Sequence, residues 1–151
     1  MEILRGRELD AKIAESEGWV WVYDTVLGIN LFMPHDDAEY CVSASVGIYT
    51  YTIPAEVEFK YPEAMPEWSR DMAYVFDLMD NSIFEWKSVE SKEELRVWCS
   101  NGSTTSYISV NLDEFDGRED AYATAYCNTY LEMLKLLYCN TYLKMLKLLG
   151  E

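Results

Sequence analysis

His35, the only histidine of the chain, is followed directly by Asp36 and Asp37. Any serine or cysteine nucleophile that relies on an imidazole would have to use this residue. One imidazole and two carboxylates could also ligate a metal ion. Adjacent carboxylates point in different directions, however, and polar residues in such a run are typical of a solvated turn. We therefore predict no metal site and no catalytic residue here.

Sequence motifs for other chemistry are missing. The seven glycines are scattered, and they form no phosphate-binding loop and no nucleophile elbow. The four cysteines, Cys41, Cys99, Cys127 and Cys139, include no CxxC pair, and the start of the chain has no apolar secretory run, so we predict reduced thiols. We expect no cofactor and no enzymatic activity. An enzyme without a recognisable motif is the least favoured alternative.

Aromatic and basic side chains are the candidates for ligand binding. Several tryptophans fall in segments that we expect to form strands, where alternate side chains share one face. Most of these rings should lie in the hydrophobic core. Rings on an exposed face of the sheet could stack on a nucleic-acid base or on a side chain of a partner protein. The candidate ligand-binding residues are Trp21, Arg70, Trp86, Lys87, Arg96 and Trp98.

The elements that position these residues indicate a single α+β domain over residues 1–151, with a mainly antiparallel sheet of about four to six strands layered by helices. Apolar periodicity and turn signals predict helices at 7–16, 69–81 and 119–149, and strands at 19–23, 83–89, 94–99 and 104–111. The continuous apolar run at 19–23 is typical of a central strand that is covered on both faces. Asn101 and Gly102 predict a hairpin between the last two strands.

Two segments need separate description. In the helix at 69–81, Ser69 is the expected cap and the expected apolar stripe consists of Met72, Val75, Phe76 and Met79. The sequence pattern of residues 25–62 predicts secondary structure less clearly. Alternating side chains before and after Pro54 predict two short strands there, and we expect an added hairpin.

Acidic residues dominate residues 1–120, which carry 25 Asp and Glu against 9 Lys and Arg, a net charge of −16, whereas residues 121–151 carry 2 against 3, a net charge of +1. This field repels phosphate backbones and attracts basic proteins, so we predict no direct nucleic-acid binding. The acidity could serve solubility alone, or it could mimic nucleic acid towards a protein that binds it. No apolar run is long enough to cross a membrane.

The end of the chain contains a duplication. Residues 126–137 read YCNTYLEMLKLL and residues 138–149 read YCNTYLKMLKLL, so the copies differ only at Glu132 and Lys144. Twelve residues at 100° each leave equivalent side chains about 120° apart around a helix. The two copies therefore cannot present the same face to one core.

The first copy is expected to pack on the sheet through Leu131, Leu134 and Tyr138. The second copy would then project freely or contact another chain, and the candidate oligomer contacts are Leu143, Leu146 and Leu149. A homodimer through this tail and a neutral duplication at a tolerant terminus both remain open. A helix lying on a membrane surface is a weaker alternative, because three lysines make a poor polar face.

Three separated segments resemble one known family. They are GRELDAKIAESEGW near the start, PEWSRDMAYVFDLMDNSIFEW in the middle and GREDAYATAYCNTYLEML near the end. In order and spacing they are similar to the motifs of the phage ABA sandwich domain family. The resemblance covers about half of the chain and leaves out most of the stretch between Trp21 and Pro66 and the duplicated tail. It implies a small bacteriophage or prophage protein with a sheet layered by helices and with no established catalytic residues.

These observations favour a non-enzymatic phage accessory protein that binds a host protein with a basic surface in the host cytoplasm. Inhibition of a host defence enzyme that handles nucleic acid is the expected role. The alternative is a small-ligand binder that sequesters a nucleotide signal among the strand aromatics. That alternative predicts a concave aromatic pocket into which Arg70, Lys87 or Arg96 points.

Overall fold

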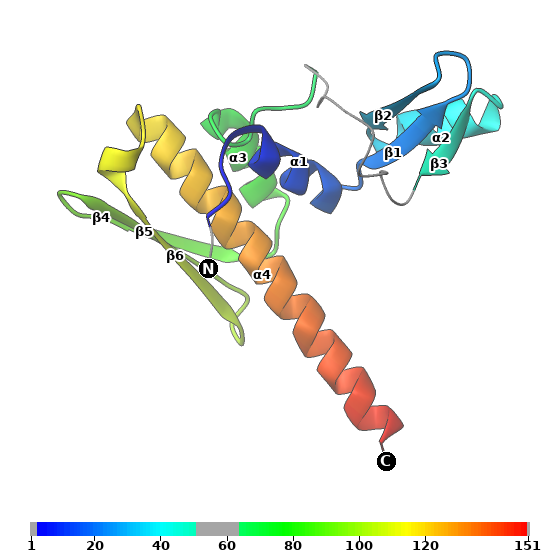
Figure 1. Ribbon diagram of the computed structural model, residues 1–151. Helices are drawn as coiled ribbons and strands as arrows, with labels where there is room; N and C mark the ends of the chain where they lie inside the picture. Colours follow the sequence, from blue (N-terminus) through cyan, green and yellow to red (C-terminus); the bar gives the residue numbers. More distant parts are fainter. Residues whose placement is uncertain (1–2, 51–63, 151) are drawn as a thin grey trace. The chain divides into compact units, whose positions relative to one another are not determined.

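The computed structural model describes residues 3–50 and 64–150, with the side chains of residues 140–144 excepted. The chain forms two compact units, unit 1 (Met1–Leu9 and Glu67–Glu151) and unit 2 (Asp10–Pro66). Its helices are α1 (Gly6–Ser16), α2 (His35–Ser43), α3 (Met72–Asp80) and α4 (Arg118–Leu149), with a short 3₁₀ turn η1 (Leu112–Glu114). Its strands are β1 (Val20–Asp24), β2 (Ile29–Met33), β3 (Gly47–Thr50), β4 (Glu85–Glu90), β5 (Glu94–Ser100) and β6 (Thr105–Asn111) (Figure 1).

The α+β class, the antiparallel pairing and the long C-terminal helix are confirmed. The six strands in the described part of the chain are divided between two sheets, sheet A in the order β2-β1-β3 and sheet B in the order β4-β5-β6. All four strand pairs are antiparallel. Among the described helices, none is both long and apolar enough to cross a membrane.

Sheet A and α2 form most of the described part of unit 2. β1 is the central strand, as predicted, but the expected cover on both of its faces is only partial. Val22 is buried, whereas Tyr23 is 40% exposed. The Trp21 ring packs on Phe32 of β2 with ring centroids 4.8 Å apart. One face of sheet A therefore carries an aromatic cluster, and α2 contacts β1 and β3.

Gly47 sits where α2 approaches sheet A. A Cβ atom at this position would lie 2.6 Å from Cγ1 of Val22 and 3.3 Å from Cβ of Cys41. The close approach of helix and strand therefore depends on the missing side chain.

The sequence interpretation of residues 25–62 was partly wrong. The expected polar turn at His35, Asp36 and Asp37 is the first turn of α2, where acidic side chains are favoured by the helix dipole. Strands are present at β2 and β3, and β3 covers the start of the alternating stretch before Pro54. The remainder of that stretch and the second expected strand lie outside the described residues.

Sheet B and α4 build the core of unit 1. The side chains of Leu95, Val97, Ile108 and Val110 point from β5 and β6 to one face of the sheet and pack with Ala125 of α4. This face alternates with an exposed one along both strands, as the period of two requires. The predicted strands and the hairpin at Asn101 and Gly102 are confirmed.

Helix α3 begins later than expected. The side chain of Asp71, not that of Ser69, caps it by accepting a hydrogen bond from the backbone N–H of Ala73 at 2.9 Å. Val75 and Leu78 are its buried residues, whereas Phe76 is 54% exposed. The expected stripe was therefore rotated, because it included Phe76 and omitted Leu78.

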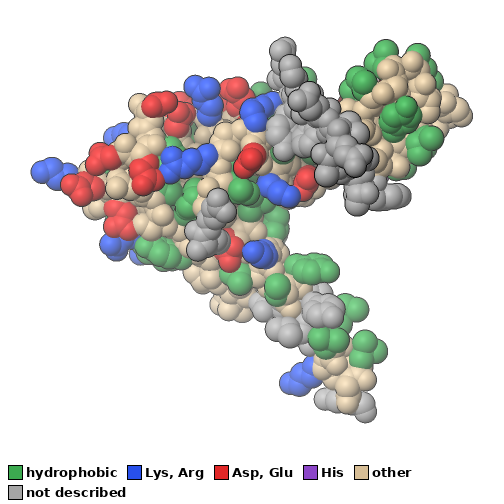
Figure 2. All heavy atoms as spheres, in the orientation of Figure 1, with side chains coloured by type: hydrophobic (Ala, Val, Ile, Leu, Met, Phe, Trp, Pro, Cys, Tyr) green, Lys and Arg blue, Asp and Glu red, His purple; other side chains and the backbone are tan. Residues whose placement is uncertain are grey.

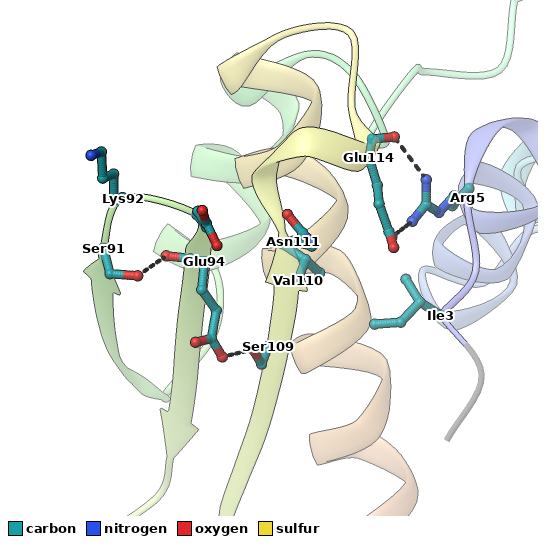
Figure 3. Close-up of a pocket in the computed structure, with 10 residues that line it drawn as sticks. Ile3, Arg5, Ser91, Lys92, Glu94, Ser109, Val110, Asn111 and Glu114 are labelled. Carbon is teal, nitrogen blue, oxygen red and sulfur yellow. Dashed lines mark hydrogen bonds and ion pairs between the residues drawn. The ribbon is translucent and has the colours of Figure 1, made fainter.

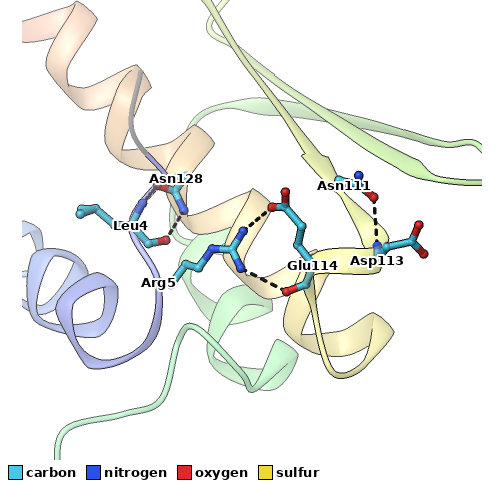
Figure 4. A network of polar contacts seen from close by, with 6 residues as sticks. All are labelled: Leu4, Arg5, Asn111, Asp113, Glu114 and Asn128. Carbon is cyan, nitrogen blue, oxygen red and sulfur yellow. Dashed lines mark hydrogen bonds and ion pairs between the residues drawn. The ribbon is translucent and has the colours of Figure 1, made fainter.

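The start of the chain is tied to α4 and η1 (Figure 4). The buried Asn128 side chain donates to the Leu4 carbonyl at 2.9 Å and accepts from the Leu4 N–H at 3.0 Å. The Arg5 guanidinium donates to the Glu114 carboxylate at 2.6 Å and to the Glu114 carbonyl at 3.2 Å. The paired bonds of Asn128 reproduce the pattern of a short backbone ladder and satisfy a buried amide.

Helix α4 continues without a break through both copies of the repeat (Figure 1). The buried residues of the first copy are Cys127–Tyr130 and Met133. Tyr138, which was expected to pack on the sheet, is 74% exposed, so that prediction was wrong. Here α4 has passed the end of sheet B and continues beyond it (Figure 1).

Candidate functional site

The exposed side of sheet B is the strongest candidate surface. We call it the outer face and define it by Lys87 and Val89 on β4, Glu94, Arg96 and Trp98 on β5, and Tyr107 and Ser109 on β6. These side chains alternate along their strands with the buried residues that pack on α4. The register aligns them in rows that cross the sheet.

One row of the outer face is aromatic and carries a cation at its end. Lys87 pairs with Trp98, and Trp98 pairs with Tyr107 on the next strand. The two ring centroids lie 5.1 Å apart, and Nζ of Lys87 lies 5.4 Å from the Trp98 ring. The ring contact and the cation over the ring both fix the Trp98 side chain. The row is therefore a preformed aromatic platform.

Beyond the aromatic row, the outer-face residues of β5 and β6 are polar. Arg96 donates to the Glu94 carboxylate at 3.2 Å, and the Ser109 hydroxyl donates to the same carboxylate. Both hydrogen bonds, chiefly the one from Arg96, lower the pKa of Glu94. The Glu94 carboxylate in turn raises the pKa of Arg96. Glu94 and Arg96 thus stay charged and neutralise each other beside the aromatic row.

A shallow hollow of about 290 Å³ adjoins the platform. It is lined by Glu85, Trp86, Lys87, Trp98 and Ser100. Its size lies near the lower limit for small-molecule pockets, which are also usually more enclosed. The hollow offers the Trp98 ring and one cation together with the Glu85 carboxylate.

A larger hollow of about 650 Å³ lies at the end of sheet B near the start of the chain (Figure 3). Its lining is mainly polar and includes Glu93, Glu94 and Glu114. The Arg5 guanidinium on its rim is held by Glu114, and Figure 3 shows the Lys92 side chain pointing away from the centre. The acidic lining makes this hollow a poor site for an anion.

The structure brings together three of the six candidate ligand-binding residues, Lys87, Arg96 and Trp98. Trp86 lines the small hollow, but its ring packs on the helix side of the sheet against Tyr126, with centroids 5.6 Å apart. Trp21 belongs to sheet A in unit 2. The guanidinium of Arg70 faces Asp120 at 3.9 Å, away from the outer face.

Tyr107 and Ser109 belong to the outer face and were missed as candidates. The signal was present in the segment from Thr105 to Asn111, where polar and aromatic side chains alternate with Ser106, Ile108 and Val110. Extending the period of two from one strand to the next would have found them. The register across the hairpin then places Tyr107 beside Trp98.

The group around His35 lies on the surface of α2. Its imidazole faces Glu39 at 3.8 Å and Asp36 at 4.0 Å, and one ligand atom from each of the three side chains lies within 4.8 Å of the others. The helix therefore pairs His35 with Glu39, four residues later, and not with Asp37. All three side chains are exposed, and exposed acidic groups of this kind are common without an ion.

The candidate oligomer contacts lie in the second copy of the repeat. Leu146 is 47% exposed and Leu149 is 81% exposed. The side chain of Leu143 lies outside the described residues. The four cysteines, which all lie in the described part of the chain, form no disulfide; Cys99 and Cys127 are buried and Cys139 is exposed.

Comparisons with known proteins identify no relative. No protein-family model, no curated protein and no solved structure matches the chain. The resemblance to the phage ABA sandwich domain family therefore stays a prediction. What the protein does has to follow from its own surfaces.

Proposed function

We propose that this protein is a non-catalytic binding protein whose outer face docks on a partner protein with a basic surface. The observation that carries the proposal is the composition of the outer face. Trp98 stands on the central strand β5 with Tyr107 beside it on β6, and charged side chains such as Lys87 and Arg96 lie next to Trp98. Protein interfaces have this arrangement, with aromatic anchors inside a polar rim.

The charge of the chain supports a basic partner. Unit 1 outside the repeat, residues 1–9 and 67–125, carries 15 acidic against 7 basic side chains, a net charge of −8. Unit 2, residues 10–66, carries 10 against 2, also −8. On the side of unit 1 shown in Figure 2 the two signs are interspersed, so the acidity acts as a long-range field and not as one acidic patch.

The biological setting of the proposal rests on the sequence resemblance alone. A bacteriophage protein of this charge would meet its partner in the host cytoplasm, and a host defence enzyme that handles nucleic acid has the basic groove that an acidic protein can occupy. Occupation of that groove would exclude the nucleic acid. The proposed role is therefore inhibition by competition for a basic surface.

A second candidate function is the binding of a small aromatic anion such as a nucleotide. The observation in its favour is the small hollow, where Lys87 lies over the Trp98 ring beside Trp86. A base could stack on the half-buried indole of Trp98 while a phosphate meets the ammonium group of Lys87. The shallow form of the hollow and the carboxylate of Glu85 disfavour tight binding of an anion.

A pulldown from host lysate at low and high salt tests the proposal. We expect one retained protein at low salt, lost at high salt because its attraction is screened. Trp98→Ala and Tyr107→Ala should each weaken binding of that protein about tenfold or more, which is the typical effect of removing an aromatic anchor. Phe76→Ala on α3, also an exposed ring, should leave binding unchanged.

Native mass spectrometry of the same samples separates the two functions. A retained nucleotide without a retained protein would favour the small-ligand function. Binding that survives both outer-face substitutions, with circular dichroism unchanged, would place the contact elsewhere on the protein and contradict the proposed surface.

A further inference from the structure

The two copies of the repeat have nearly the same sequence and different surroundings. Met133 is fully buried, whereas its counterpart Met145 is 56% exposed. Cys127 is buried and Cys139 is exposed. Leu148 and Leu149 at the end of α4 are 74% and 81% exposed. The second copy therefore carries the apolar side chains of a core segment into solvent.

Five apolar side chains of α4, half-buried or exposed, lie along one side of the helix. We define the tail stripe as Leu131, Leu134, Tyr138, Met145 and Leu149. At 100° per residue these five positions fall within an arc of about 60°. Leu131 and Leu134 are half-buried, and exposure rises to 74% at Tyr138. The spacings of three, four and seven residues are those of a helix that packs along another helix.

The length of the tail indicates that it needs a partner. The tail stripe runs over 18 residue steps, or about 27 Å. The second copy adds 12 residues beyond the first, and its described apolar side chains lack the packing on sheet B that buries the earlier part of α4. Packing of an apolar face is the usual source of stability for such a helix.

The charge of the tail selects the partner. Residues 121–151 carry 3 lysines against 2 acids, in a chain whose remainder carries 25 acids against 9 basic residues. Lys147 lies about 160° around the helix from Leu131, so it stays on the polar side when the tail stripe is covered. A basic partner would repel this segment, whereas an acidic protein would attract it, and the chain itself is such a protein.

We propose that the tail stripe is a dimerisation surface, on which α4 of a second copy of this chain packs in the antiparallel direction. The antiparallel direction places each lysine-bearing tail beside the acidic unit 1 of the other chain. In a parallel pair, the two copies of unit 1, each with a net charge of −8 outside the repeat, would lie side by side and repel each other. With the two-fold axis near residue 140, Leu131 of one chain meets Leu149 of the other.

This arrangement uses a surface different from that of the proposed function. The outer face belongs to the opposite side of sheet B from α4, so a dimer through the tail stripe leaves Trp98 and Tyr107 open. Figure 2 shows hydrophobic side chains and a basic side chain at the tail end. The body of unit 1, in contrast, carries many acidic side chains. Success or failure of either proposal can be observed without the other.

Sedimentation velocity and native mass spectrometry of the full chain test the proposal. We expect a species of twice the 17.6 kDa chain mass. The double variant Met145→Glu, Leu149→Glu should shift this species to the monomer, because four carboxylates would enter the dimer contact. Leu148→Glu is the matched control, since Leu148 is exposed but lies about 100° from Leu149. It should stay dimeric.

A thiol experiment tests the direction of pairing. Cys139 lies about 80° around the helix from Leu131 and Leu149, outside the tail stripe, so it is replaced by serine in this test. Because Leu131 of one chain meets Leu149 of the other, the variant Leu131→Cys, Leu149→Cys in this background should give a covalent dimer on mild oxidation. In the Cys139→Ser background, Leu149→Cys alone should not form this link in an antiparallel pair, because the two new thiols would lie about 27 Å apart along the axis. Efficient linkage by Leu149→Cys would overturn the antiparallel direction.

Two results would overturn the dimer itself. The first is a wild-type chain that remains monomeric at about 100 μM, a concentration at which even weak dimers with micromolar dissociation constants are populated. The second is a monomer that co-sediments with phosphatidylglycerol vesicles and loses this binding in Met145→Glu, Leu149→Glu, which would assign the tail stripe to a membrane surface. An equal loss of dimer in Leu148→Glu would also contradict the stripe.

Discussion

At the scale of single residues, the repeat provides a matched pair of thiols. Cys127 and Cys139 have the same neighbours in sequence, but Cys127 is buried and Cys139 is exposed. We expect iodoacetamide to modify Cys139 in the native protein and to reach Cys127 only after unfolding, because reactivity requires both access and the thiolate form. Peptide mapping after short exposure measures the two rates. Equal rates would show that α4 opens along its whole length.

Cys99 gives the protein a predicted sensitivity to alkaline pH. Burial raises the pKa of its thiol from 9.0 to about 12, against a smaller opposite effect of a hydrogen bond with Ser106. The Cys99 thiol therefore loses its proton at a lower pH in the unfolded chain than in the folded protein. Its contribution to the free energy of unfolding is complete below pH 9 and declines as pH rises towards 12. Urea unfolding at several pH values should show a shallower decline for Cys99→Ala than for wild type. Identical slopes would contradict the raised pKa.

At the scale of elements, the close approach of α2 to sheet A depends on Gly47. Gly47→Ala places a methyl group within 2.6 Å of the Val22 side chain, and we expect a loss of about 1–3 kcal/mol in the stability of unit 2. Gly117→Ser is the control, because nothing lies within 4 Å of a Cβ there, its φ of −152° suits any residue, and serine is favoured at the N-cap position of α4 that Gly117 occupies. Thermal unfolding followed by tryptophan fluorescence measures both variants. A stable Gly47→Ala protein would mean that α2 can shift.

Local signals explain which elements the sequence could predict. The hairpin at Asn101 and Gly102 and the long helix were found because turn chemistry and apolar periodicity lie within the segments themselves. Helix α2 was missed because its start contains three polar residues and Ala38 is its only buried residue among those described. Its helical state depends on contact with β1 and β3, which no local pattern records.

The candidate site was predicted in part for the same reason. Lys87, Arg96 and Trp98 were singled out by residue type, and the register of β4 with β5 places them on one face. Trp86 is adjacent to Lys87 in sequence and therefore points to the other side of the sheet. Residue type alone does not tell these two sides apart. The side of the sheet on which a residue lies is decided by the phase of the alternation along the strand. This phase is fixed by the side of sheet B that α4 covers.

At the scale of the whole molecule, self-repulsion should govern the response to salt. The chain carries a net charge of −15, and the ion pairs that the structure describes, such as Arg5 with Glu114, are largely exposed. Exposed pairs contribute little, whereas like charges oppose the compact state. We expect the unfolding temperature to rise between 10 and 200 mM sodium chloride, which differential scanning fluorimetry can measure. A fall in this range would show that ion pairs outweigh the repulsion.

The repeat length of α4 sets how the helix can grow. Each further copy of 12 residues would lengthen it by about 18 Å and turn its surface by another 120°. Three copies contain 36 residues, which is ten complete turns, so a fourth copy would again face the direction of the first. A short unit added at a helix end can therefore change reach and facing direction together without disturbing the residues already packed on sheet B.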